Sequence, residues 1–126
     1  MDVLAFLHAK LDVADMARAM DFYCGKLGCK VIVRYPIPKG EIVQVSPTGN
    51  SPGVELWYES DAPAPVRTGV HIAFAVQDTR ALAERLRSEG VEVAEEPFEI
   101  GDEVIAFVRD PDGYLVELNQ NDQGQL

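Results

Sequence analysis

The sequence has few cysteines, no long apolar run and a shortage of basic residues. Its two cysteines, Cys24 and Cys29, are too few for a disulfide framework or a four-cysteine zinc site. We expect both to be reduced, partly buried thiols. No apolar run approaches the roughly 20 residues of a membrane-spanning helix, and residues 1–4 lack the basic start of a signal peptide. These absences predict a cytoplasmic protein.

Basic side chains are outnumbered almost two to one. Eleven Lys and Arg stand against 21 Asp and Glu, which gives a formal net charge of -10. Such a chain repels the phosphates of nucleic acid and anionic lipid surfaces, so we expect neither as a partner. With 47% hydrophobic and 25% charged residues in a chain of 126, the composition is that of a soluble globular domain and excludes intrinsic disorder.

One pattern occurs twice along the chain at a nearly constant offset. Residues 8–15 and 71–78 each have His first, Val five places later and Asp seven places later. Further on, Val54-Glu55-Leu56 matches Val116-Glu117-Leu118. The offset is 63 for the histidines (71 − 8) and 62 for the glutamates (117 − 55). Matches in the same order at the same offset indicate a duplicated unit.

Each unit is predicted to be a strand, a helix and then three strands. We expect first strands at 6–13 and 72–76, because apolar residues alternate there. Asp15 and Asp78 are placed as helix N-caps, and Gly28 and Gly90 as the residues that end the helices. Turns are expected at 36–40, 47–50 and 110–113, the last of these between two hairpin strands.

The fold class is therefore α+β, with two βαβββ modules whose curved mixed sheets carry helices outside. The modules are expected at 4–59 and 68–119, joined by a proline-containing linker at 60–67. Because neither module alone buries its sheet and helix well, we expect the two to pack together as one domain, within a chain or across a dimer.

Alternation along the strands separates polar from apolar side chains. On the first strand the apolar set is expected to face the helix, namely Leu7, Ala9, Leu11 and Val13, and the opposite face carries His8, Lys10 and Asp12. By the same argument Glu55, Trp57 and Glu59 share one face of a later strand. His71 and Glu117 also lie away from the helices. The repeated His and Glu are thus expected on interior walls.

Two buried carboxylates without compensation would be destabilising, and a divalent cation resolves this. The candidate ligands are His8, Glu55, His71 and Glu117. Mixed imidazole and carboxylate donors suit nickel, cobalt or zinc, and also iron or manganese, better than calcium or magnesium. Any one of the four taken alone would more commonly be a solvated or hydrogen-bonded residue, so the interpretation depends on the repeat.

At these residues the sequence resembles the vicinal oxygen chelate superfamily, which includes glyoxalases, bleomycin-resistance proteins and dioxygenases. The matching segments span nearly the whole chain, at 7–11, 21–23, 27–28, 54–56, 69–73 and 106–118. Within the superfamily it is most similar to bacterial glyoxalase I. The resemblance implies the same four metal ligands, and a homodimer in which each metal takes two ligands from each subunit.

The chemistry implied by the resemblance is isomerisation of a hemithioacetal to a 2-hydroxyacyl thioester. The hemithioacetal forms from a thiol and a 2-oxoaldehyde. The metal stabilises an enediolate as a Lewis acid, and a carboxylate moves the proton between neighbouring carbons. Glu117 is our first candidate for this base, and Glu55 is the second.

Two positions depart from the glyoxalase I pattern, which has Arg four residues after the first His and Asn four residues after the first Glu. Here these positions are Asp12 and Glu59, and residues 95–103 are acidic as well. Lys10 offsets only part of this charge. A neutral or cationic thiol conjugate, or a small vicinal-oxygen compound, would suit this acidic wall better than a conjugate of glutathione, and the use of glutathione stays open. Trp57 is either a stacking surface for it or a core residue, and the acidic residues are alternatively solvated rim residues.

Two other functions fit the same family. Dioxygenases and thiol transferases use two His and one Glu, and epimerases have Gln at the second position, so Glu55 argues against all three. A metal-free antibiotic-binding protein, like the bleomycin-resistance members, would suit an acidic pocket with Trp57. The complete set of four ligands argues against that alternative, although the fold alone does not decide.

Overall fold

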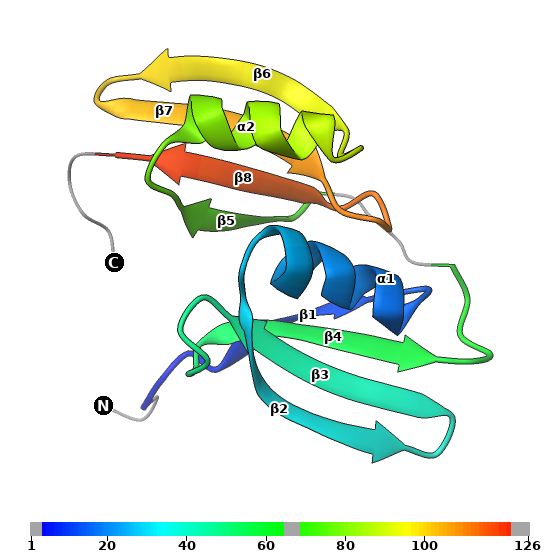
Figure 1. The fold of residues 1–126 in the computed structure, drawn as a ribbon. Helices are drawn as coiled ribbons and strands as arrows, with labels where there is room; N and C mark the ends of the chain where they lie inside the picture. The colour runs from blue at the N-terminus through cyan, green and yellow to red at the C-terminus, as the bar shows by residue number, and fades with distance from the viewer. Residues whose placement is uncertain (1–3, 65–68, 122–126) are drawn as a thin grey trace. The chain divides into compact units, whose positions relative to one another are not determined.

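A computed structural model describes residues 4–64 and 69–121 of the chain (Figure 1). The elements are β1 (His8–Asp12), α1 (Met16–Met20), the π-helical segment η1 (Asp21–Lys26), β2 (Lys30–Ile37), β3 (Gly40–Ser46), β4 (Gly53–Glu59), β5 (His71–Ala75), α2 (Thr79–Ser88), β6 (Val93–Ile100), β7 (Glu103–Arg109) and β8 (Leu115–Gln120). The chain divides into two compact units after residue 66.

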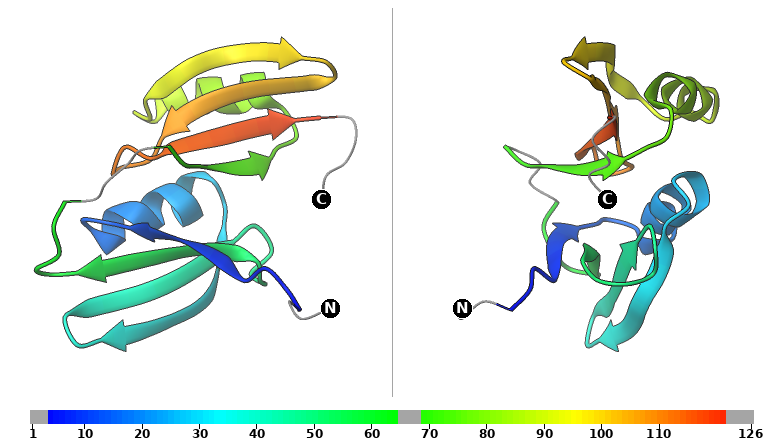
Figure 2. Two further views of the ribbon diagram at one scale, coloured as in Figure 1. Left: turned by 180° about the vertical axis from the view of Figure 1, so that it is seen from behind. Right: turned by 90° about the vertical axis from the view of Figure 1, so that its left-hand side faces the viewer.

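The two units have the same topology. The first sheet has the strand order β1-β4-β3-β2 and the second β5-β8-β7-β6. In each, the first pair is parallel and the other pairs are antiparallel. One helix covers one face of each sheet (Figure 2). The predicted α+β fold of duplicated βαβββ modules is thereby confirmed, whereas their union as one domain stays a prediction. Residues 65–68, which include the end of the predicted linker, lie outside the described residues.

The ends of both helices follow the sequence signals. The Asp15 carboxylate accepts a hydrogen bond from the Arg18 N–H, and the Asp78 carboxylate accepts one from the Ala81 N–H, each at 3.0 Å. These are N-cap bonds that satisfy otherwise unpaired donors. Gly28 and Gly90 have φ of 81° and 87°, in the left-handed region that favours glycine and ends a helix. All four predicted positions are confirmed.

The first unit departs from the expectations in three places. The strand expected at 6–13 is the shorter β1, and Leu7 before it is 60% exposed instead of facing the helix. The first helix changes to π-helical hydrogen bonding after Met20. Pro36, expected in a turn, lies within β2. Because β2 is an edge strand, its proline removes no hydrogen bond that the sheet needs.

The hairpin predicted at residues 110–113 is confirmed. β7 and β8 pair antiparallel on either side of it. One oxygen of the Asp110 carboxylate accepts hydrogen bonds from the backbone N–H groups of Asp112 and Tyr114, each at 2.9 Å. Side-chain bonds of this kind fix a tight turn, so the strand that carries Glu117 starts at a defined position.

The two cysteines are free thiols, as expected, with Cys24 half-buried and Cys29 buried. Burial raises the pKa of the Cys29 thiol to about 11, with a smaller contribution from Cys24. A thiol with such a pKa is protonated at neutral pH and is a poor nucleophile. Within the described residues no helix is long and apolar enough to cross a membrane.

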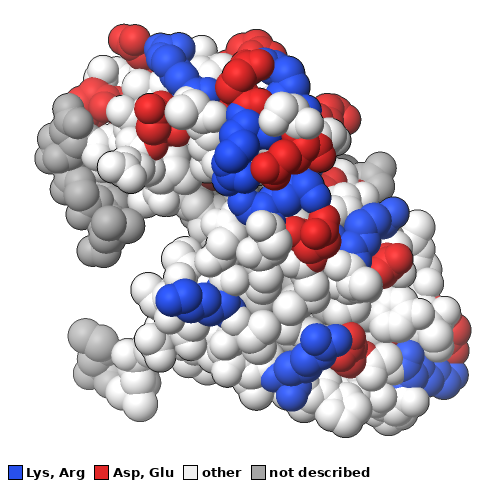
Figure 3. Space-filling model, in the orientation of Figure 1, with Lys and Arg blue, Asp and Glu red and all other residues white. Residues whose placement is uncertain are grey.

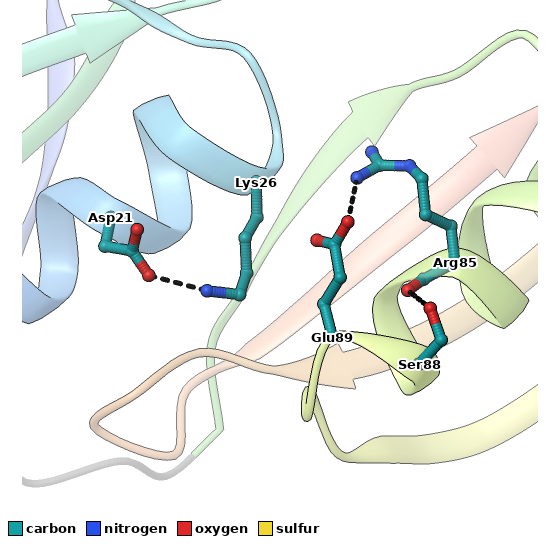
Figure 4. A network of polar contacts seen from close by, with 5 residues as sticks. All are labelled: Asp21, Lys26, Arg85, Ser88 and Glu89. Carbon is teal, nitrogen blue, oxygen red and sulfur yellow. Dashed lines mark hydrogen bonds and ion pairs between the residues drawn. The ribbon is translucent and has the colours of Figure 1, made fainter.

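Acidic and basic side chains alternate over α2 and its neighbouring strands (Figure 3). At the end of α2, Arg85 pairs with the C-cap residue Glu89 at 3.0 Å, and in the first unit Lys26 pairs with Asp21 at 2.5 Å (Figure 4). These pairs are exposed, and exposed pairs add little to stability. Stability therefore depends mainly on the apolar side chains beneath the helices.

Replacing Leu86 with alanine is expected to lower the free energy of unfolding by about 2 to 5 kcal/mol. Leu86 belongs to α2 and its side chain is fully buried on the face of the helix that packs on the sheet, so the truncation leaves a cavity. Leu82→Ala, at a half-buried position of the same helix, is the matched control and should cost less. Urea unfolding followed by circular dichroism measures both. Equal losses in the two variants would contradict this assignment of the core.

Candidate metal centre

The first unit brings His8 and Glu55 together on the sheet face opposite α1, which we call its open face. β1 and β4 are parallel neighbours, with His8 paired to Gly53, so Glu55 is two residues ahead on the adjacent strand. His8 Nε2 lies 3.4 Å from Glu55 Oε2. The same oxygen accepts a 2.8 Å hydrogen bond from Gln44 Nε2, on the next strand. Glu55 is only 5% exposed, so this carboxylate is fixed between two partners.

The second unit brings His71 and Glu117 together in the same way. His71 is paired to Leu115 in the parallel β5–β8 register, so Glu117 is again two residues ahead. His71 Nε2 lies 3.0 Å from Glu117 Oε1. The other carboxylate oxygen accepts a 2.8 Å hydrogen bond from Asn119. The imidazole also meets the Phe107 ring edge-on, with centroids 5.2 Å apart.

In each His–Glu pair, the nitrogen and oxygen atoms are spaced as two neighbouring ligands of one divalent cation would be. Two donor atoms about 2.1 Å from the same ion lie roughly 3.0 Å apart at a right angle and roughly 3.4 Å apart at the tetrahedral angle. The observed separations of 3.4 Å for His8–Glu55 and 3.0 Å for His71–Glu117 match these values. Among the described residues no three His, Cys, Asp or Glu side chains gather at one point. The four-ligand set therefore stays a prediction, and the structure establishes two pairs.

Two amide side chains in these sites were not expected from the sequence. Asn119 follows Glu117 by two residues, so strand alternation alone places both on one face, and this signal was available. Gln44 lies on a different strand and reaches Glu55 only because the β3–β4 register sets them opposite each other. Nothing in the sequence near either residue indicates that register.

The four predicted substrate-binding residues also gather on the open face of β1 and β4. Asp12 is paired with Trp57 in the register. Lys10 Nζ lies 3.1 Å from Asp12 Oδ1 and 4.4 Å from the centroid of the Trp57 ring. The indole N–H donates to Glu59 at 2.7 Å. We call these residues the rim. Their role in binding stays a prediction.

The acidic segment at 95–103 is divided between the two faces of the second sheet. Glu96 and Glu99 are ion-paired with arginines of α2, and so lie on the helix side. Glu95 is paired in register with Phe107, and Glu103 with Ile100. Since Phe107 contacts His71, Glu95 shares the open face with the second His–Glu pair. Only part of the predicted acidic wall is therefore on the side of the site.

Duplicated βαβββ units, each with a His and a Glu on its open face, define one class of protein. The family model for the Glyoxalase/Bleomycin resistance protein/Dioxygenase superfamily matches residues 5–118. The chain belongs to this superfamily, and the resemblance stated from the sequence is confirmed.

Within the superfamily the chain is similar to lactoylglutathione lyases. It is 36% identical over 123 residues to a lactoylglutathione lyase of Arabidopsis thaliana, covering 91% of this chain but 44% of that protein. It is 33% identical to the lactoylglutathione lyase of Neisseria meningitidis, covering 96% of this chain and 94% of that protein. The chain thus spans less than half of the plant relative and nearly all of the bacterial one.

Two solved structures mark the range of functions among similar folds. The trypanothione-dependent glyoxalase I of Leishmania major superposes with a TM-score of 0.82 at 31% identity, covering 96% of this chain and 89% of that one. TnmS3, an antibiotic-binding protein from Streptomyces sp. CB03234, superposes with a TM-score of 0.78 at 27% identity, covering 97% and 99%.

Proposed function

We propose that the protein is a glyoxalase-I-like lyase of the cytoplasm that converts hemithioacetals to 2-hydroxyacyl thioesters. The observation that carries the proposal is the repeated His–Glu pair at the same register in both sheets. The similarity to lactoylglutathione lyases supports it. The identity of the thiol is left open at this point, because one enzyme of similar structure, the glyoxalase I of Leishmania major, is trypanothione-dependent.

His8, Glu55, His71 and Glu117 would hold the divalent cation, with nickel, cobalt or zinc favoured by these donors. When bound, the cation supplies Lewis-acid stabilisation of negative charge on two adjacent substrate oxygens. Four protein ligands would leave up to two positions for substrate oxygens if the ion is octahedral. The amides of Gln44 and Asn119 would hold the carboxylates in orientation.

Glu117 is assigned the proton transfer. It takes the proton from the carbon that bears the sulfur and returns it to the neighbouring carbon, so the reaction is an isomerisation with no net oxidation. Its side chain is 14% exposed, against 6% for Glu55. Glu117 is thus the more accessible of the two carboxylates to a substrate. Glu55 remains the second candidate.

The complete site is assigned to a homodimer in which each cation takes two ligands from each subunit. One unit supplies a single His–Glu pair, and two ligands are too few for a catalytic centre of this kind. A closed twofold dimer places the first unit of one chain opposite the second unit of the other and generates two equivalent sites.

Sequestration of an antibiotic is the second candidate function. The similarity to TnmS3 over 97% of the chain favours it, and the half-exposed Trp57 ring offers an aromatic surface to a cationic drug. It leaves the two His–Glu pairs without a role.

Turnover before and after removal of metal decides between the two functions. The purified protein is stripped with a chelator, divided, and reloaded with nickel, cobalt or zinc, and each sample is assayed with methylglyoxal hemithioacetals of several thiols. The lyase predicts thioester formation that is lost on stripping and restored by at least one metal. Absence of turnover with every metal and thiol, together with tight binding of a cationic aromatic drug by stripped protein, would favour sequestration.

A further inference from the structure

The rim holds an ammonium group between an aromatic ring and a carboxylate. Lys10 Nζ lies 4.4 Å from the centroid of the Trp57 ring and 3.1 Å from Asp12 Oδ1. Glu59 accepts the indole N–H at 2.7 Å, which places a second carboxylate at the edge of the same ring. An aromatic face beside carboxylates is an arrangement that binds cations. Here it is occupied by a cation of the chain itself.

This cation-binding group adjoins the first His–Glu pair. In the β1–β4 register Lys10 is paired with Glu55, and Asp12 with Trp57. Residues two apart on a strand are separated by about 6.6 Å and point to the same face. A substrate held at His8 and Glu55 therefore reaches the rim with a tail of only a few bonds.

The charge on this part of the face is negative. Along β1 and β4, both described in full, the open face carries two carboxylates besides the proposed metal ligand Glu55. These are Asp12 and Glu59, and they stand against one ammonium group, that of Lys10. The Lys10 and Asp12 side chains are 45% and 54% exposed. Exposed ion pairs are weak, so displacing the Lys10 ammonium from this position costs little free energy, whereas an incoming carboxylate would meet like charge.

We propose that the rim selects the thiol half of the substrate, favouring thiols that carry a cationic group over thiols that carry a carboxylate. The inference rests on the proposed lyase function and deepens it by naming the substrate class. Asp12 and Glu59 supply the charge, Trp57 supplies the aromatic surface, and Lys10 occupies the cation position while no substrate is bound.

The test uses three thiols of similar length that differ in charge. Thiocholine is cationic, N-acetylcysteamine is neutral and 3-mercaptopropionate is anionic. Their methylglyoxal hemithioacetals are compared by kcat/KM on the metal-loaded protein. We expect the cationic conjugate to exceed the anionic one by about tenfold, the size of one cation–π contact together with one screened charge interaction. Added salt should reduce the ratio, because exposed charges are screened.

A charge-neutral variant identifies the residues responsible. In Asp12→Asn/Glu59→Gln the tenfold ratio should fall to within about twofold. Glu41→Gln is the matched control, because Glu41 is paired in register with Tyr58 and so lies on the helix side of the same sheet. It should retain the wild-type ratio. A double variant that keeps the tenfold ratio would overturn the proposal, and so would a wild-type preference for the anionic thiol that is lost in Lys10→Gln.

A binding measurement separates this inference from the proposed function. Trp57 is the single tryptophan of the chain, so its fluorescence reports ligands at the rim without any turnover. The S-methyl ethers of the three thiols serve as unreactive probes. Tighter binding of the cationic ether, absent from the double variant, would support the rim assignment even if no hemithioacetal reacts. Turnover of all three hemithioacetals at equal kcat/KM, with equal binding of the ethers, would overturn the rim and leave the lyase intact.

Discussion

Glu117→Gln is expected to lower kcat by about a thousandfold with every hemithioacetal that the wild-type protein converts. Glutamine keeps the shape of the side chain and one acceptor oxygen, replaces the other oxygen with an NH2 donor, and does not take up a proton. In the structure one oxygen of Glu117 meets His71 and the other accepts from Asn119, so the substitution changes the chemistry with little change in packing.

The comparison of Glu117→Gln with Glu55→Gln assigns the base. Both remove a carboxylate from a His–Glu pair, so both are expected to weaken metal binding. Only loss of the base should also reduce turnover of protein that is fully loaded with metal. Metal content is therefore measured on the same samples, and Glu99→Gln, on the helix side of the second sheet, serves as control. Wild-type kcat in loaded Glu117→Gln would contradict the assignment, and a larger loss in Glu55→Gln would reverse it.

Two inactive variants are expected to restore activity to each other. If each site takes its first pair from one chain and its second pair from the other, a heterodimer of His8→Ala and His71→Ala has one site with both defects and one intact site. Chains with different tags, co-expressed and purified on both tags, should therefore have about half of the wild-type activity.

The matched control combines two defects of the same unit. In a dimer of two differently tagged His8→Ala chains, each site keeps one damaged first pair, so no activity should return. Recovery in this control, or no recovery in the first heterodimer although it forms and binds metal, would contradict a site shared between subunits.

The sequence predicts those features of the site that depend on local spacing. Asp15 and Asp78 cap their helices as expected, because capping involves residues three apart. The His–Glu pairs follow from strand alternation together with the repeat, since alternation sets the face and duplication sets the partner. The hairpin at Asp110 is likewise encoded within a few residues.

Features that depend on long-range register are not predictable in this way. Gln44 reaches Glu55 across two strands that are joined by a loop, and only the assembled sheet sets them opposite each other. The contact of Lys10 with the Trp57 ring likewise requires the parallel β1–β4 pairing. The π-helical segment after Met20 has no distinct signal either, because its apolar spacing is also that of an α-helix.

The most direct test of the account is metal content, measured by elemental analysis on wild-type protein and on His71→Ala, each purified without a chelating tag. If the two His–Glu pairs form one centre, wild-type protein holds about one nickel, cobalt or zinc ion per chain. The variant, lacking one imidazole ligand, should lose most of that ion on dialysis. Wild-type protein that holds no metal and takes up none on titration, or a variant that retains its full metal content, would contradict the account.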